Sequence, residues 1–128
     1  MLIHFESMKE EVKRWIEQSK IDFSTAKYNF KGKKYYIVLF LCQQAIEKVL
    51  KALWLKKNNK EVPKTHDLMY LAKRLNLPEN FNTILEDLSS IYLESRYPDM
   101  SIKIPGKKFS KEEAKKFIDE TERILKWI

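Results

Sequence analysis

The residues best suited to chemistry lie in three short polar segments, the first of them around Glu47. Residues three and four positions apart share one face of a helix, so this stretch presents an amide, a carboxylate and two ammonium groups together. The groups belong to Gln44, Glu47, Lys48 and Lys51, with Gln43 beside them. Such a face can hold a nucleotide. The alternative is a solvated face, on which a Glu47 to Lys51 pair contributes only tenths of a kcal/mol.

The other two segments each combine a structural signal with one chemically useful side chain. In Thr65-His66-Asp67, Thr65 can cap a helix and Asp67 suits the positive end of its dipole, which leaves His66 unexplained. In the segment RYPD at residues 96–99, Arg96 suits the last turn of a helix, and the residues after it form a turn. His66 and Arg96 are therefore the chemically useful side chains of these two segments.

The sequence argues against a metal centre, a catalytic triad and a phosphate loop. It holds two histidines and one cysteine, with no close cluster of metal ligands. Its two glycines are Gly32 and Gly106, far apart in the sequence, so there is no glycine-rich loop to hold a phosphate. We therefore expect neither a metal nor a cofactor.

Hydrophobic periodicity predicts the helices that must position these segments. Apolar residues recur at alternating steps of three and four in five stretches, which predicts four long helices and one short one. Their expected bounds are near 7–30, 33–57, 65–76, 78–96 and 110–128, with a polar, lysine-rich loop before the third and a proline-containing loop at 98–109. Capping boxes, in which Ser7 pairs with Glu10 and Ser110 with Glu113, should begin the first and last helices. The last helix is expected to bury Ala114, Phe117, Ile118, Thr121, Leu125 and Ile128.

The second predicted helix is unusual because residues 37–41 are apolar on every side. A segment of this kind must be buried on more than one face, so the helix lies at the centre of the fold or in a subunit interface. Phe40 falls in this segment, one turn before the polar face of Glu47, and is where such an interface would lie.

The composition is that of one small all-α domain. The 128 residues suffice for one core, 44% of them are hydrophobic, and 2 glycines and 4 prolines supply few turns for a β-rich fold. We predict an antiparallel up-and-down helical bundle that forms a single domain over residues 1–128. No apolar stretch approaches the roughly 20 residues of a membrane helix, and no secretory signal precedes the first helix. With Cys42 alone in an apolar run, a cytoplasmic protein without membrane contact is expected.

The charge balance favours acidic partners. Twenty-five basic residues against 18 acidic ones give a net charge of +7, which suits RNA, DNA, nucleotides or an acidic protein. Enrichment in lysine and glutamate is also a habit of hyperthermophiles, so the charge has a second explanation without a partner.

Three segments together resemble motifs of the prokaryotic HEPN domain family. They read CQQAIEKVLKAL at 42–53, PKTHDL at 63–68 and SRYPD at 95–99, in the same order as in the family. The resemblance implies an up-and-down bundle that commonly forms a homodimer, with a polar cleft for a nucleotide or RNA. It also implies a minimal nucleotidyltransferase partner, with which some relatives form a toxin-antitoxin pair. By position it assigns ligand binding to Gln44, Glu47, Lys48, Lys51, His66, Arg96 and Asp99, and Asp22 on the first helix is expected to face them.

One departure from the superfamily bears on activity. The ribonucleases of the superfamily that this chain resembles carry an arginine followed four to six residues later by a histidine. No histidine follows Arg96 in this chain. Proton transfer by such a group is typically worth 10² to 10⁴ in rate, so cleavage by the usual route is not expected. Three functions remain: a binding module, a metal-independent ribonuclease that uses Arg96 with His66, and a purely structural dimer.

Overall fold

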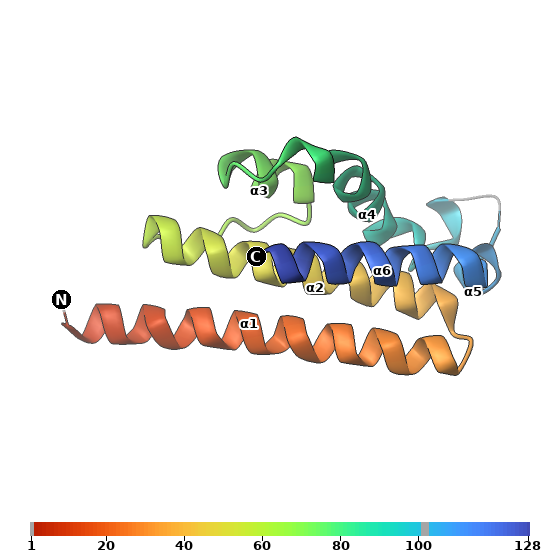
Figure 1. Cartoon of the computed structure of the whole chain (residues 1–128), viewed down its shortest axis with the longest axis horizontal. Coiled ribbons are helices and arrows are strands. Elements are labelled where there is room, and N and C mark those ends of the chain that lie inside the picture. Colours follow the sequence, from red (N-terminus) through yellow and green to blue (C-terminus); the bar gives the residue numbers. More distant parts are fainter. Residues whose placement is uncertain (1, 101–102) are drawn as a thin grey trace.

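The computed structural model describes residues 2–100 and 103–128, and their side chains except those of residues 2–8 and 100. The described part is helical and contains no strand. Consecutive long helices alternate in direction, as in an up-and-down bundle (Figure 1). The elements are α1 Leu2–Lys31, α2 Tyr35–Asn58, α3 Leu68–Arg74, α4 Asn82–Glu94, α5 Pro105–Lys108 and α6 Lys111–Trp127, with 3₁₀ turns at Glu79–Phe81 and Pro98–Met100. The all-α bundle predicted from the sequence is confirmed.

Helices α1 and α2 form a long antiparallel hairpin (Figure 1). Small side chains let the two backbones approach, and the buried Ser19 hydroxyl donates a hydrogen bond of 2.6 Å to the carbonyl of Ala45 on α2. Phe23 and Ala26, which follow Ser19 at steps of four and three residues, are also buried. The periodicity of α1 therefore identified the face that packs on α2.

The turn between α1 and α2 places an unusual demand on Lys33. The amide of Lys33 donates to the Phe30 carbonyl, and the amide of Lys34 donates to the Asn29 carbonyl, the bond pattern of a Schellman motif. The motif requires a left-handed residue at its centre, and Lys33 takes this conformation with φ of 61°. Gly32 lies one position too early to supply it.

Replacing Lys33 by glycine is therefore expected to raise the free energy of unfolding by about 0.5–1 kcal/mol. The left-handed conformation costs a residue with a side chain about 1–2 kcal/mol, and the greater freedom of glycine in the unfolded chain offsets part of the gain. Urea denaturation measures the change. Gly32→Ala is the control, because a Cβ at position 32 would lie 3.7 Å from its nearest neighbour, an ordinary contact, and should cost no stability. A less stable Lys33→Gly variant would contradict the assignment.

Helix α2 lies at the centre of the fold, which was one of the two positions predicted from its apolar segment 37–41. It contacts α1, α3, α4, α5 and α6. Leu39, Ile46 and Leu50 are fully buried on it, and so is Cys42. Burial raises the pKa of the Cys42 thiol to about 12, and the Thr121 hydroxyl offsets only part of that rise. The thiol is thus a protonated core group, as expected.

The cap of the third helix differs from the prediction. The side chain of Asp67, and not that of Thr65, accepts hydrogen bonds from the first free amides, those of Met69 and Tyr70, at 3.0 and 3.2 Å. The Thr65 hydroxyl instead accepts from the amide of Asp67 at 3.1 Å. Because α3 begins two residues later than a Thr65 cap would have it, His66 lies in the preceding loop, where the helix does not fix its direction.

Two further segments and one predicted core residue also differ from the prediction. Helix α1 begins at Leu2, so Ser7 lies inside it, and the expected capping pair involves a side chain outside those described. The segment 98–109 contains the turn Pro98–Met100 and helix α5. The capping box at Ser110 and Glu113 is confirmed. At the other end of α6, Ile124 is fully buried, whereas Ile128 is 36% exposed, because the helix ends beside solvent.

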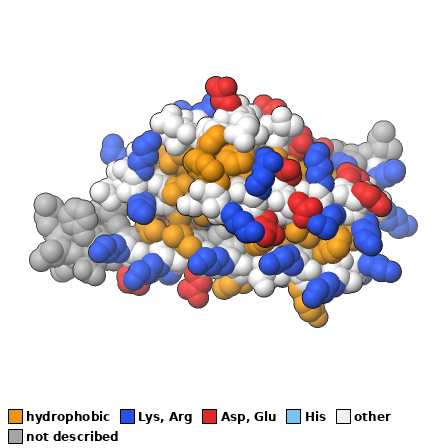
Figure 2. All heavy atoms as spheres, in the orientation of Figure 1, with side chains coloured by type: hydrophobic (Ala, Val, Ile, Leu, Met, Phe, Trp, Pro, Cys, Tyr) orange, Lys and Arg blue, Asp and Glu red, His pale blue; other side chains and the backbone are white. Residues whose placement is uncertain are grey.

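The surface carries mixed charge on the side seen in Figure 2. Lysine and arginine side chains are spread over this face among aspartates and glutamates, so the net charge of +7 forms no single patch there. Within the described residues, none of the helices combines the length and apolar character that a membrane crossing needs.

Candidate functional site

The carboxylate of Glu47 is the centre of a buried polar cluster. It accepts a hydrogen bond from the Gln43 amide nitrogen at 3.0 Å and an ion pair from Lys51 Nζ at 3.2 Å, both one turn away on α2. His66 Nδ1 lies 2.9 Å from Oε1, the oxygen that also accepts from Gln43, while Lys51 contacts Oε2. The side chains of Glu47 and Lys51 are only 5% and 8% exposed. The solvated face considered as an alternative is therefore not what forms.

His66 joins this cluster to helix α4. Its ring stacks on Tyr92 with centroids 3.9 Å apart and planes 13° from parallel, while 51% of its side chain remains exposed. The ring is thus held at two points, by a carboxylate at Nδ1 and by an aromatic face. Both contacts are possible because Asp67, and not Thr65, caps α3, so that His66 lies in the loop before the helix.

Arg96 lies on the same tyrosine. Its guanidinium carbon is 5.2 Å from the ring centres of Phe40 and Tyr92 and 5.4 Å from that of Tyr97. Glu94, two residues earlier, pairs instead with Lys108. Among the described residues no carboxylate pairs with Arg96, and its side chain is exposed. His66 and Arg96, predicted from separate segments, therefore share contact with one ring.

Asp22 and Lys48 form a second ion pair beside the first. Lys48 Nζ donates to Asp22 Oδ2, and the Gln18 amide donates to Asp22 Oδ1 at 2.9 Å. The Asp22 side chain is 9% exposed and that of Lys48 20%. The pair ties α1 to α2, so Asp22 does turn inward, toward Lys48.

Gln44 and Asp99 complete the predicted set. The Gln44 amide donates to Gln43 Oε1 at 2.7 Å, so it extends the chain of hydrogen bonds that ends at Glu47. Asp99 is exposed in the turn Pro98–Met100 and makes none of these contacts within the described part of the chain. The structure thus gathers Gln44, Glu47, Lys51, His66 and Arg96, places Asp22 with Lys48 next to them, and leaves Asp99 apart.

Tyr92 is the residue of this site that the sequence did not single out. It lies on α4, where its ring is partly buried. The available signal was its position four residues before Arg96, because residues so spaced share a helix face. No group of three or more His, Cys, Asp or Glu side chains among the described residues is placed to hold a metal ion.

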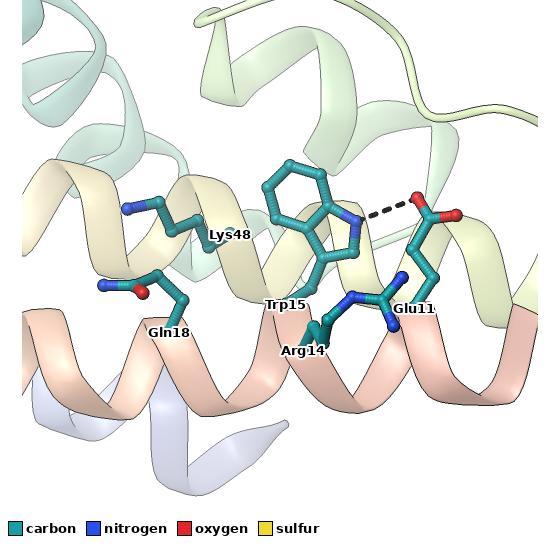
Figure 3. Close-up of a pocket in the computed structure, with 5 residues that line it drawn as sticks. All are labelled: Glu11, Arg14, Trp15, Gln18 and Lys48. Carbon is teal, nitrogen blue, oxygen red and sulfur yellow. Dashed lines mark hydrogen bonds between the residues drawn. The ribbon is translucent and has the colours of Figure 1, made fainter.

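Two open pockets flank the cluster. One, of about 540 Å³, lies between the α2–α3 loop and α4 and is lined by residues that include His66, Asp67, Ser89 and Tyr92. The other, of about 420 Å³, lies on the α1 side. Figure 3 shows it bordered by Glu11, Arg14, Trp15 and Gln18 of α1 and by Lys48 of α2. The two ion pairs, Glu47 with Lys51 and Asp22 with Lys48, therefore lie close to both pockets.

Comparison with known proteins agrees with this architecture. Residues 12–128 match the HEPN domain family. The structure is similar to that of TT1696 from Thermus thermophilus, with a TM-score of 0.83 and 26% identity over 91% of this chain and 94% of that one. It is also similar to ST0689, an archaeal HEPN homologue, with a TM-score of 0.77 and 31% identity over 91% and 93% of the two chains. No curated protein matches the sequence.

Proposed function

The chain belongs to the HEPN domain family, and from that premise we propose that it is a binding protein that recognises a nucleotide or RNA at the surface formed by His66, Tyr92 and Arg96. A guanidinium group binds phosphate with strong, directed hydrogen bonds, and aromatic rings offer faces on which a base can stack. These three side chains place both kinds of group next to each other.

The observation that carries the proposal is the environment of the Arg96 guanidinium group. An exposed arginine usually finds a nearby carboxylate or points freely into solvent, whereas Arg96 is bordered by three aromatic rings and pairs with no carboxylate in the described part of the chain. Its five donors are therefore available to an external anion.

The buried residues serve this surface indirectly. Glu47, Lys51 and Gln43 satisfy one another, and their role is to hold His66 in place beside Tyr92. Asp22 and Lys48 brace α1 against α2 below them. Of the predicted ligand-binding residues, we assign ligand contact to His66 and Arg96 and a positioning role to Glu47, Lys51 and Gln44.

We extend the proposal to the partners that the family implies. The chain acts as a single cytoplasmic domain, forms a homodimer, and pairs with a minimal nucleotidyltransferase in a toxin-antitoxin-like module. Leu93 and Tyr97 lie on either side of Arg96 in the sequence and are both 42% exposed, which supports an interface at the edge of the site. Analytical ultracentrifugation of the purified chain tests the dimer.

The binding function is tested by titrating the protein with AMP, ATP and a short RNA in a calorimeter. We expect binding that Arg96→Gln weakens about 10- to 100-fold, the usual effect of losing charged hydrogen bonds. Arg74→Gln is the matched control, since Arg74 is also an exposed arginine stacked on a tyrosine, at 3.6 Å from the ring of Tyr70. If no ligand binds, or if Arg96→Gln lowers only the melting temperature, the purely structural interpretation replaces ours.

A second candidate function is metal-independent RNA cleavage, favoured by the contact of His66 with Glu47. A carboxylate only accepts, so a neutral His66 ring keeps its proton on Nδ1 and leaves the lone pair of Nε2 free to take a proton. Arg96, on the same tyrosine, would meet the phosphate. We expect an active protein to cut RNA in EDTA and His66→Ala to abolish cutting, while His4→Ala, the other histidine, has no effect. Cleavage that survives in His66→Ala excludes this function.

A further inference from the structure

The pocket on the α1 side of the cluster has features that suit a second nucleic-acid base. At its centre is Trp15, whose indole projects from α1 toward α2, with Lys48 and Gln18 on one side and Glu11 and Arg14 on the other (Figure 3). The ring is partly exposed. Its Nε1 donates a hydrogen bond of 3.2 Å to Glu11, one turn earlier, which fixes the orientation of the ring.

The charges around Trp15 favour an anionic ligand. Glu11 is the one acidic residue of the five that line the pocket, and its carboxylate is already engaged by Trp15. Arg14 is exposed and pairs with no carboxylate in the described residues. An oriented indole beside a free guanidinium is the combination that single-stranded nucleic acids meet in their binding proteins, where a base stacks and the next phosphate is neutralised.

Trp15 is also connected directly to the first site. Lys51 Nζ lies over the indole, 5.8 Å from its centroid, and the same ammonium is 3.2 Å from Glu47 Oε2. Glu47 Oε1 in turn lies 2.9 Å from His66. Three successive contacts thus connect the indole to the ring of His66, so Trp15 and His66 each contact one partner of the same buried ion pair.

We propose that the Trp15 pocket is a base-stacking subsite, and that the ligand is therefore a single-stranded oligonucleotide and not a mononucleotide. One base cannot occupy two aromatic surfaces at once, so a ligand that uses both must carry at least two. The proposal rests on the nucleotide-binding function assigned to His66, Tyr92 and Arg96, and it adds the class of ligand and a site that lies outside those residues.

The test compares AMP with tetra-adenylate, as RNA and as DNA, and reads the fluorescence of Trp15 alone. The chain has 3 tryptophans, so the protein used carries Trp54→Phe and Trp127→Phe. We expect tetra-adenylate to quench Trp15 and AMP to bind without quenching. In the otherwise native chain, Trp15→Leu should weaken tetra-adenylate binding roughly 5- to 150-fold, the contribution of one stacked base, and leave AMP binding unchanged.

A charge pair of variants supplies a second readout. Arg14→Gln should reduce the salt dependence of tetra-adenylate binding, whereas Lys20→Gln, which removes one charge from an exposed position of the same helix outside the pocket, should reduce it less. Quenching of Trp15 by either the RNA or the DNA form of tetra-adenylate supports the subsite. The form that binds more tightly identifies the type of nucleic acid.

The possible failures are distinct. Equal affinity for AMP and tetra-adenylate without quenching overturns the subsite and leaves the proposed function standing. An equal loss of both affinities in Trp15→Leu also overturns it, because Trp15 would then act only by supporting Lys51 and Glu47. Absence of binding to every ligand overturns the subsite and the proposed function together.

Discussion

Replacing Glu47 by alanine is expected to lower the free energy of unfolding by about 3–5 kcal/mol, the usual cost of removing one partner of a buried ion pair. The Lys51 side chain is 8% exposed, so its ammonium would lose its carboxylate without gaining water. The amide of the fully buried Gln43 would lose its acceptor as well. Urea denaturation followed by circular dichroism measures the loss.

The matched control is Glu122→Ala on α6. Glu122 and Lys126 form a pair with the same four-residue spacing, at 2.9 Å, but on the surface, where screening by water leaves little to lose. A double variant, Glu47→Leu with Lys51→Met, should recover most of the stability, because it removes both buried charges together. Equal effects of Glu47→Ala and Glu122→Ala would show that the Glu47 pair is solvated after all.

Replacing Leu50 by alanine is expected to lower the free energy of unfolding by about 2–5 kcal/mol. The change opens a cavity in the core beside α2, the helix against which all the others pack. Leu50 is fully buried and belongs to the hydrophobic core, on the stretch of α2 that lies among its neighbours. Little rearrangement can fill the space, since α2 is held by helices on several sides. Thermal and urea denaturation both report the change.

Leu93→Ala serves as the control for the same chemical change. Leu93 is 42% exposed on α4, so its truncation should alter stability by less than about 0.5 kcal/mol. If Leu50→Ala were as mild as Leu93→Ala, α2 would not be the centre of the core. Leu50 lies in the core and not on the proposed ligand surface, so nucleotide affinity at low temperature should survive in Leu50→Ala.

Local signals predicted most helices but failed where a pattern could mean two things. Ser110 and Glu113 follow a proline-containing segment that breaks the preceding structure, and their capping box forms as predicted. Ser7 and Glu10 have the same spacing, yet residues 2–6 contain no glycine or proline to stop a helix, so α1 begins earlier. The competition between Thr65 and Asp67 for one cap was likewise decided by the geometry of the loop.

The sequence predicted most members of the candidate site, but it missed Tyr92, wrongly included Asp99, and did not predict the arrangement. The spacing of Glu47 and Lys51 fixes their pairing, since both lie on one helix face. Whether that face is exposed to water depends on residues from elsewhere in the chain: His66 in a loop contacts Glu47, and Trp15 of α1 lies against Lys51. These contacts join residues far apart in the sequence, which periodicity does not relate. At the level of the sequence, only the resemblance of the three segments to HEPN motifs predicted that they form one site.

The central place of α2 has a consequence for synthesis on the ribosome. Helix α1 is made before α2 and can pair with it at once, whereas the sides of α2 that α4 and α6 cover must wait until residues 59–110 and then α6 itself have emerged. During that interval the α1–α2 hairpin presents fully apolar turns such as 37–41 to the surrounding solvent. The nascent hairpin is thus the stage at which this chain is most exposed to aggregation and to capture by chaperones.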